Sequence, residues 1–247
     1  SVDGVFAAGN VRDPSQQVIR AAADGAWVGA MVAFDLTSAA SSAAGDGAHH
    51  AAAHSSTAHA EWERRYEGAP VWSGNPNGSL VAEFGGEDGA GRRALDVGAG
   101  EGGDVNWLAE QGWRVTAADL SSNALARAAA EADRRRIEME TIATDANVVD
   151  AFGVDAAGGA DAPGVGYDLV TAHYSSIPRT ADGRGIANLI GAVAPGGSLL
   201  VVGHDPTPMR DPGRRSAFDP DAYVTPEDVA AVLADDPAWT IEHCETR

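Results

Sequence analysis

The stretch that decides the fold is Leu95-Asp96-Val97-Gly98-Ala99-Gly100-Glu101-Gly102. A short apolar run over residues 93–97 leads into these glycines, and a helical pattern continues to residue 110. Glycine lets the backbone approach a ligand closely, and the first turn of a helix has free N–H groups. The stretch therefore predicts a strand, a ligand-binding turn and a helix in succession. The spacing Gly-x-Gly-x-x-Gly is also typical of dinucleotide sites, so by itself it does not identify the ligand.

The rest of the chain from residue 61 onward alternates helical segments with short apolar runs, which is typical of an α/β protein. This alternation predicts a mostly parallel sheet with helices on both faces, as in Rossmann-like folds. Thr225-Pro226-Glu227-Asp228 further predicts a helix start with a capping box. The predicted buried strands cover residues 93–97, 114–118, 140–143, 167–172, 197–203 and 239–244.

Three acidic residues stand at the ends of successive predicted strands. Asp96 precedes the glycines, where a dinucleotide fold has an apolar residue near the pyrophosphate, so its charge favours a cofactor that carries an ammonium group and no phosphate. Asp119 follows about 23 residues later, the spacing of a carboxylate that accepts hydrogen bonds from ribose hydroxyls. Asp145 ends the third strand, where it could accept a hydrogen bond from an adenine amino group. The three acids predict an S-adenosylmethionine site at the carboxyl edge of the sheet.

In these features, and in Ala194-Pro195-Gly196-Gly197 before the fifth strand, residues 93–205 resemble the class I S-adenosylmethionine-dependent methyltransferases. Upstream, residues 62–66 (Trp-Glu-Arg-Arg-Tyr) and residues 72–77 (Trp-Ser-Gly-Asn-Pro-Asn) look like the opening of the tellurite-resistance and thiopurine methyltransferase group. The resemblance implies the Rossmann-like class I fold, S-adenosylmethionine as cofactor and S-adenosylhomocysteine as product. That family normally adds a seventh, antiparallel strand, which this sequence lacks after its sixth.

The candidate site residues follow from the strand ends and from this resemblance. The residues after the fourth strand face the transferable methyl group in this fold, so His173 and Tyr174 are candidate catalytic residues, and a pocket-shaping role is the alternative. The candidate cofactor-binding residues are Trp72, Asp96, Gly98, Ala99, Gly100, Gly102, Asp119, Leu120, Asp145, Ala146 and His173.

The expected reaction is methyl transfer by in-line displacement to a small molecule. The resemblance implies a thiol, a chalcogen oxyanion or a heteroaromatic acceptor. Two alternatives stay open: a fragment of an NAD(P)- or FAD-linked oxidoreductase, and a module of a fused protein that binds S-adenosylmethionine without catalysis.

Composition excludes other kinds of partner. The formal net charge of −19 opposes binding to a phosphate backbone, so no nucleic acid is expected. The apolar runs are too short to span a membrane. The single cysteine, Cys244, excludes an internal disulfide and a multi-thiolate metal site, and no metal is predicted. A reducing, cytoplasmic location is expected.

The two ends of the chain depart from the central pattern. Residues 5–14 (Val-Phe-Ala-Ala-Gly-Asn-Val-Arg-Asp-Pro) and the helix predicted from Pro14 to about Leu36 resemble the C-terminal end of thioredoxin-reductase-like FAD oxidoreductases, with Asn10 in place of the usual Asp. Residues 1–37 are therefore interpreted as a remnant of such a protein, residues 38–60 as a flexible linker, and residues 61–247 as the methyltransferase domain. The missing last strand predicts an exposed edge, completion by another chain, or a homodimer.

Overall fold

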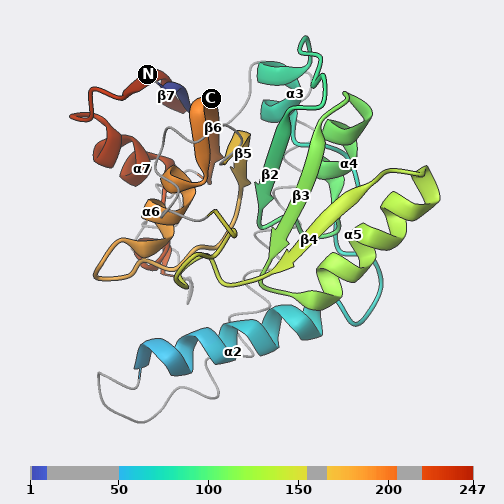
Figure 1. Cartoon of the computed structure of the whole chain (residues 1–247). Coiled ribbons are helices and arrows are strands. Elements are labelled where there is room, and N and C mark those ends of the chain that lie inside the picture. The colour runs from blue at the N-terminus through green and yellow to red at the C-terminus, as the bar shows by residue number, and fades with distance from the viewer. Residues whose placement is uncertain (1, 10–49, 155–165, 205–218, 247) are drawn as a thin grey trace.

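A single sheet organises the computed structural model, which describes residues 2–9, 50–154, 166–204 and 219–246. Within those residues the sheet has seven strands in the order β4-β3-β2-β5-β6-β1-β7. The strands are β1 (Val2–Gly9), β2 (Arg93–Val97), β3 (Arg114–Asp119), β4 (Met139–Ala143), β5 (Tyr167–His173), β6 (Val193–Val202) and β7 (Trp239–Thr246). All strand pairings in the described sheet are parallel, so their carboxyl ends meet at one edge (Figure 1).

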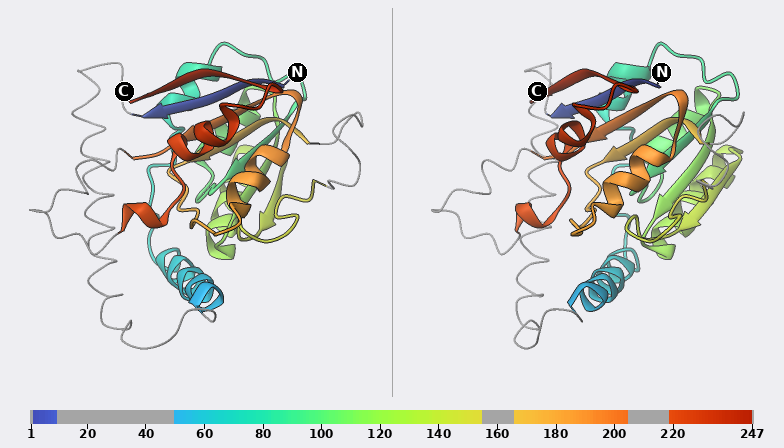
Figure 2. Two further views of the ribbon diagram at one scale, coloured as in Figure 1. Left: turned by 90° about the vertical axis from the view of Figure 1, so that its left-hand side faces the viewer. Right: turned by 60° about the vertical axis from the view of Figure 1, so that its left-hand side comes forward.

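Helices cover both faces of the sheet, as the alternating pattern predicts. Leu80, Val105 and Leu125, from α3, α4 and α5, belong to the apolar core on one face. Leu189 and Val229, from α6 and α7, belong to the core on the other face (Figure 2). The helices are α2 (His50–Arg65), α3 (Gly78–Phe84), α4 (Gly103–Glu110), α5 (Ser122–Arg135), α6 (Arg184–Gly191), the short 3-10 helix η3 (Pro220–Ala222) and α7 (Pro226–Leu233).

Local sequence signals account for several of these boundaries. The capping box predicted for α7 is confirmed, because Thr225 accepts from the Asp228 N–H while Asp228 accepts from the Thr225 N–H. The prediction that β4 is a buried strand is wrong, since its residues are exposed or half-buried. The reason is position: β4 is the edge strand beyond β3, so only one neighbour covers it.

The N-terminal strand completes the sheet in a way that the sequence does not reveal. β1 lies between β6 and β7 and is parallel to both; Ala7 pairs with Val201 on one side and with Cys244 on the other. β1 is therefore an interior strand of the sheet, and β7 is the edge strand beyond it. Within the described residues, every strand pairing of the sheet is parallel, and completion by another chain or a homodimer stays a prediction.

The segments before the main domain also differ from expectation. Residues 50–60 were expected to belong to a flexible linker, yet they form the first part of α2. Ala is abundant in this segment, and its high helix propensity accounts for the difference. The helix predicted from Pro14 to about Leu36 lies outside the described residues.

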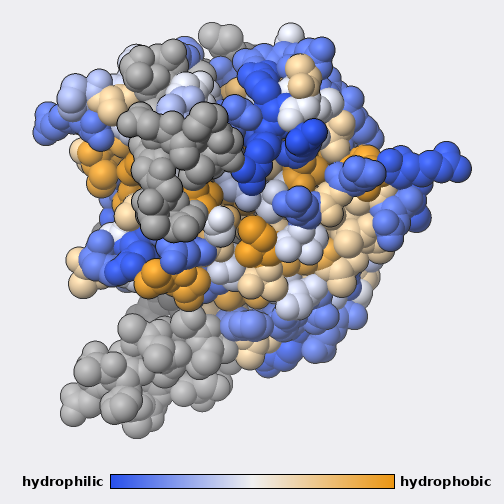
Figure 3. All heavy atoms as spheres, viewed as in Figure 1, coloured by the Kyte–Doolittle hydropathy of each residue, from blue (hydrophilic) through white to orange (hydrophobic). Residues whose placement is uncertain are grey.

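Hydrophilic and apolar residues share the described surface. On the face drawn in Figure 3, hydrophilic residues lie mainly toward the rim, and apolar residues lie among less polar ones nearer the middle. Among the described helices, none combines the length and the apolar character that a membrane-spanning segment needs.

Candidate functional site

A pocket of about 560 Å³ opens at the carboxyl edge of the sheet, where the strand ends face α2. That size is within the range of small-molecule and cofactor sites. Its walls come from α2, the segment after α2, the glycine turn, and the ends of β3, β4, β5 and β6. The predicted site residues that line it are Trp72, Asp96, Gly98, Ala99, Gly100, Asp119, Leu120, Asp145, Ala146, His173 and Tyr174.

The glycine turn brings the backbone close to neighbouring side chains. Gly98 and Gly100 have positive φ angles of +79° and +53°. A Cβ atom on Gly98 would lie 2.8 Å from the Ser175 Cβ, and one on Gly100 would lie 3.2 Å from the Tyr66 Oη. Both positions therefore favour glycine for conformation, and at Gly98 a side chain would also clash with Ser175.

The N–H groups of the turn are used within the protein, which sequence reasoning did not anticipate. Gly98 and Ala99 donate to the Ala118 carbonyl over 2.8 and 3.1 Å, and Gly102 donates to the Ala99 carbonyl over 2.9 Å. Gly100 donates to the Asp119 Oδ2 over 2.8 Å. A dinucleotide site offers such groups to a pyrophosphate. This turn instead permits close approach, which suits a cofactor without phosphate.

Gly102, unlike the other predicted cofactor-binding residues, is not among the residues that line the pocket. It is the N-cap of α4 with φ +84°. A Cβ atom there would lie 2.8 Å from the Ala128 Cβ on α5. Gly102 therefore allows α4 and α5 to pack closely, and a direct contact with the cofactor stays a prediction.

Asp119 and Asp145 end adjacent strands and face the same pocket. The Asp119 carboxylate accepts from the Gly100 and Ser121 N–H groups, each over 2.8 Å. Burial, with the negative charge of Glu63, raises the pKa of Asp119 above its ordinary value, although the N–H donors oppose the shift. Asp145 accepts from the Asn147 N–H over 2.8 Å. Both carboxylates are thus held in place before any ligand binds.

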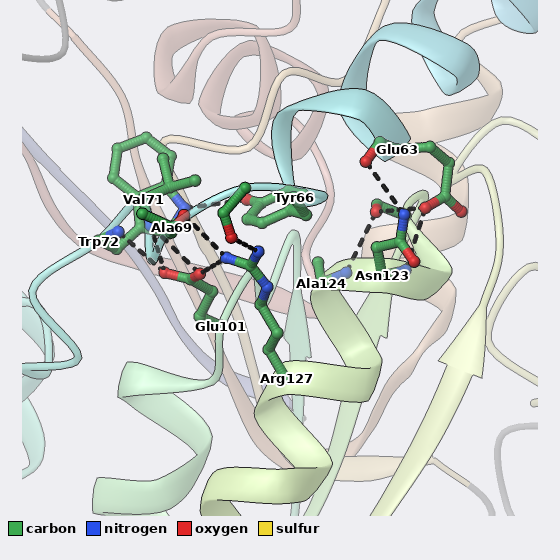
Figure 4. Close-up of polar contacts among 11 residues, drawn as sticks. Glu63, Tyr66, Ala69, Val71, Trp72, Glu101, Asn123, Ala124 and Arg127 are labelled. Carbon is green, nitrogen blue, oxygen red and sulfur yellow. Dashed lines mark hydrogen bonds and ion pairs between the residues drawn. The ribbon is translucent and has the colours of Figure 1, made fainter.

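Glu101 ties the segment after α2 to the glycine turn (Figure 4). Its carboxylate accepts from the N–H groups of Val71 and Trp72 over 3.0 and 2.9 Å and is paired with Arg127. The Trp72 indole donates to the Tyr66 Oη over 2.9 Å. Trp72 is therefore fixed over Gly100, where the resemblance predicted a cofactor-covering residue.

Replacing Glu101 with Gln should loosen this cover. The amide has one oxygen, so it could accept either from the Val71 and Trp72 N–H groups or from Arg127, while its NH2 group would face the other donors. The ion pair with Arg127 would be lost in either case. Losing one hydrogen bond to a charged group costs about 1.5–3 kcal/mol, so we expect about ten-fold weaker cofactor binding or more. Calorimetry with S-adenosylhomocysteine measures this. The matched variant Glu110→Gln, at an exposed residue of α4, should bind as the wild type does; equal affinity of both variants would contradict the role of Glu101.

Glu63 fixes α2 against the start of α5 (Figure 4). Its carboxylate accepts from the N–H groups of Ser122 and Asn123 over 2.7 and 3.0 Å and from the Ser121 hydroxyl over 3.0 Å. Burial alone would raise the pKa of the Glu63 carboxyl. The hydrogen bonds from these donors lower it by more, so the pKa lies below its ordinary value. A carboxylate at a helix N-terminus is also favoured by the helix dipole. α2 is thereby held across the carboxyl edge of the sheet.

A buried group of charged residues lies under the glycine turn. The His173 Nδ1 is 2.8 Å from the Asp104 Oδ2, and both side chains are at most 5% exposed. Asp104 also accepts from the Asn77 N–H over 2.6 Å and from its side-chain amide over 2.8 Å. Asp96 accepts from the Thr171 hydroxyl over 2.7 Å. The predicted residues His173 and Asp96 are thus neighbours, and Asp104 joins them.

The residues that sequence reasoning missed have weak local signals. Asp104 sits in the first turn of α4, where an acid also serves the helix dipole, and so it reads as a structural residue. Glu63 and Arg127 are charged residues of amphipathic helices, which normally face solvent. Only Glu101, inside the glycine stretch, could have been found from its place in the motif.

Uncharged polar and aromatic side chains line the part of the pocket next to the ends of β5 and β6. Tyr174 has φ +52°, a rare conformation for a non-glycine residue, and its ring centroid lies 4.4 Å from that of His204. Burial lowers the pKa of His204 to about 4, so its imidazole is neutral at pH 7. Ser175 and Tyr223 line the same region. His204, which follows β6, also lines the pocket.

Residues 94–197, from β2 into β6, match a protein family described as "Methyltransferase domain". The match includes the glycine turn and the strand ends that carry Asp119, Asp145 and His173. No curated protein matches the chain. None of the comparisons supports the resemblance of the N-terminal segment to FAD oxidoreductases.

Several solved structures are similar to the central part of the chain. One comes from a study of the conversion of a disulfide bond into a thioacetal group during echinomycin biosynthesis; it is 26% identical, covers 54% of this chain and 55% of its own, and has a TM-score of 0.41. A Thiobacillus denitrificans methyltransferase in complex with S-adenosyl-L-homocysteine is 23% identical, with coverages of 51% and 48% and a TM-score of 0.38. TehB from Haemophilus influenzae is 18% identical, with coverages of 57% and 44% and a TM-score of 0.39. The chain thus spans about half the length of these proteins.

Proposed function

We propose that this chain, which contains a methyltransferase domain of Rossmann-like class I fold, transfers a methyl group from S-adenosylmethionine to a small-molecule acceptor. One observation carries the proposal: a pocket joins the glycine turn to the carboxylates of Asp119 and Asp145, and the N–H groups of the turn residues Gly98, Ala99, Gly100 and Gly102 already have acceptors within the protein. A phosphate-free adenosine cofactor fits this combination of groups, whereas a dinucleotide does not.

Each part of the cofactor has a matching group in the pocket. Asp119 accepts hydrogen bonds from the ribose hydroxyls, and Asp145 accepts one from the adenine amino group. Asp96 faces the ammonium of the amino-acid part, with Gly98 and Gly100 allowing the backbone to come close. Leu120, Ala146 and Trp72 provide apolar contact around the adenosine and the cofactor's chain.

The cofactor supplies an activated methyl group on a sulfonium, so the protein's task is to position the acceptor and exclude water. Trp72 and α2 cover the pocket, and Glu63 and Glu101 hold that cover in place. Tyr174 and His204 stand at the end of β5 and after β6, where they orient the acceptor for in-line attack. Because burial lowers the pKa of His204 to about 4, its imidazole is a weak base, and its role here is to orient the acceptor.

The charge of the pocket narrows the acceptor class. Among the lining residues that the structure describes, Arg65 is the one basic residue of the Lys or Arg type, against Glu61, Asp96, Glu101, Asp104, Asp119 and Asp145. A dianionic oxyanion would be repelled by these acids. Of the acceptors that the resemblance implies, a thiol or a heteroaromatic therefore fits better than a tellurite-type oxyanion. A homodimer and a cytoplasmic location stay predictions.

A panel of acceptors tests the proposal. The protein is incubated with S-adenosylmethionine that carries an isotopically labelled methyl group and with thiols, thiopurines, selenite and tellurite in turn. We expect label in a thiol or heteroaromatic product and none with the oxyanions. Binding of the cofactor without transfer to any member would instead support the silent module, and transfer to tellurite alone would contradict the charge argument.

A further inference from the structure

The buried group under the glycine turn has a geometry that the proposed reaction does not require. Thr171 and His173 lie two residues apart on β5 and so face the same side of the sheet, and Asp96 is the register partner of Thr171 on β2. Asp104 approaches from the first turn of α4. One ligand atom each of Asp96, Asp104 and His173 lie within 4.8 Å of one another.

Each carboxylate in this group has its own hydrogen-bond donor, and His173 stands between them. Asp104 accepts hydrogen bonds from the Asn77 N–H and side-chain amide, and its Oδ2 lies 2.8 Å from the His173 Nδ1, a distance that suits an ion pair. The Thr171 hydroxyl donates to Asp96. Both ring nitrogens of His173 are buried, and among the described residues neither has a partner with hydrogen-bond geometry.

The charges of the group decide its chemistry. Two carboxylates buried at this distance repel each other strongly, and one of them would take up a proton unless a positive charge lay between them. Burial lowers the pKa of His173, but Asp104 and Asp96 raise it more, so the net shift is upward and favours the imidazolium. With the imidazolium in place, the group carries one net negative charge.

We propose that His173 is a buried cationic bridge that keeps the Asp96 carboxylate charged for the ammonium group of the cofactor, and that Asp104 and Asn77 position it. This inference rests on the proposed function, because it assigns His173 to cofactor binding. In this proposal His173 holds the cofactor site and does not act as a base on the acceptor, because an imidazolium cannot accept a proton. Its Nδ1 lies against Asp104 of α4, whereas the Tyr174 and His204 rings pack against each other in the pocket wall.

The pH dependence of binding follows from the groups that face Asp96. Burial and the charges of Asp104 and Asp119 raise the pKa of Asp96 to about 7, while His173 and Thr171 hold it down. Only ionised Asp96 attracts the ammonium, so the affinity should rise with pH through about 7 and level off above it. Without His173, the pKa of Asp96 should rise further and the whole profile should move to higher pH.

Calorimetry with S-adenosylhomocysteine between about pH 6 and 8.5 tests this for the wild type, His173→Gln and the control His243→Gln. One unit of pKa shift corresponds to about a ten-fold change in affinity. We expect His173→Gln to bind about ten-fold more weakly at pH 7 and to recover toward the wild type as the pH rises, and His243→Gln, on β7 away from the pocket, to match the wild type. An unchanged affinity and pH profile in His173→Gln would overturn the bridge. A wild type that binds at no pH would refute the proposed function.

NMR titration of the histidine side chains tests the bridge without any cofactor. His173→Gln identifies the signal by its loss, and thermal unfolding shows that each variant folds. We expect the wild-type His173 to titrate above its ordinary value of about 6.5 and Asp104→Asn to lower that value, because the neighbouring negative charge is lost while burial remains. A His173 that stays neutral in the wild type at pH 6 would overturn the bridge even if cofactor binding is normal.

Discussion

Replacing Asp119 with alanine should weaken binding of S-adenosylhomocysteine by about a hundred-fold or more. In the proposed complex its carboxylate accepts hydrogen bonds from two ribose hydroxyls, and hydrogen bonds to a charged group are worth about 1.5–3 kcal/mol each. The same carboxylate holds the Gly100 and Ser121 N–H groups, so its loss also loosens the turn that approaches the cofactor. Calorimetric titration gives the affinity directly.

Two controls separate the loss of the ribose contact from a general defect. Asp133→Ala removes an exposed acid of α5 outside the pocket and should bind as the wild type does. Urea unfolding of Asp119→Ala shows whether the sheet remains intact. An Asp119→Ala protein that folds and binds with wild-type affinity would place the ribose elsewhere and contradict the proposed site.

Placing proline at Ala7 should destabilise the protein by about 3 kcal/mol or more. Ala7 lies in β1 with a strand on either side, and proline cannot donate to a sheet hydrogen bond and is not accommodated in an interior strand. The free energy of unfolding in urea measures the loss. The control Ala40→Pro, in the segment where the sequence predicts a linker, should have little effect. Equal unfolding midpoints for both variants would show that β1 does not belong to the sheet.

The sequence predicts the central half of this fold well because its signals there are local. The strand over residues 93–97 was predicted to the residue, and the predicted strands that begin at Arg114 and Tyr167 each extend one residue further in the structure. Apolar runs bounded by glycine turns and helical patterns suffice for such strands. The position of β1 could not be predicted in this way, because it depends on pairing with β6 and β7, far along the chain.

In the candidate site, too, the features with local sequence signals were predictable and the long-range contacts were not. Glycines and strand-end acids mark the pocket because their spacing is set by the fold itself. The sequence could not show which N–H groups of the turn bind acceptors within the protein, or that Gly102 lies against Ala128 and outside the pocket lining. The sequence also could not show that Asp104 contacts His173. The two residues are far apart along the chain, and only the packing of α4 on the sheet brings the Asp104 Oδ2 to 2.8 Å from the His173 Nδ1.

The most direct test of the account is a calorimetric titration of the intact wild-type chain with S-adenosylmethionine, S-adenosylhomocysteine and NADH at pH 8. We predict one binding site for each of the two adenosyl compounds and no heat of binding with NADH, since the turn offers a pyrophosphate no free N–H from Gly98, Ala99, Gly100 or Gly102. Binding of NADH together with failure to bind either adenosyl compound would contradict the proposed site and with it the function.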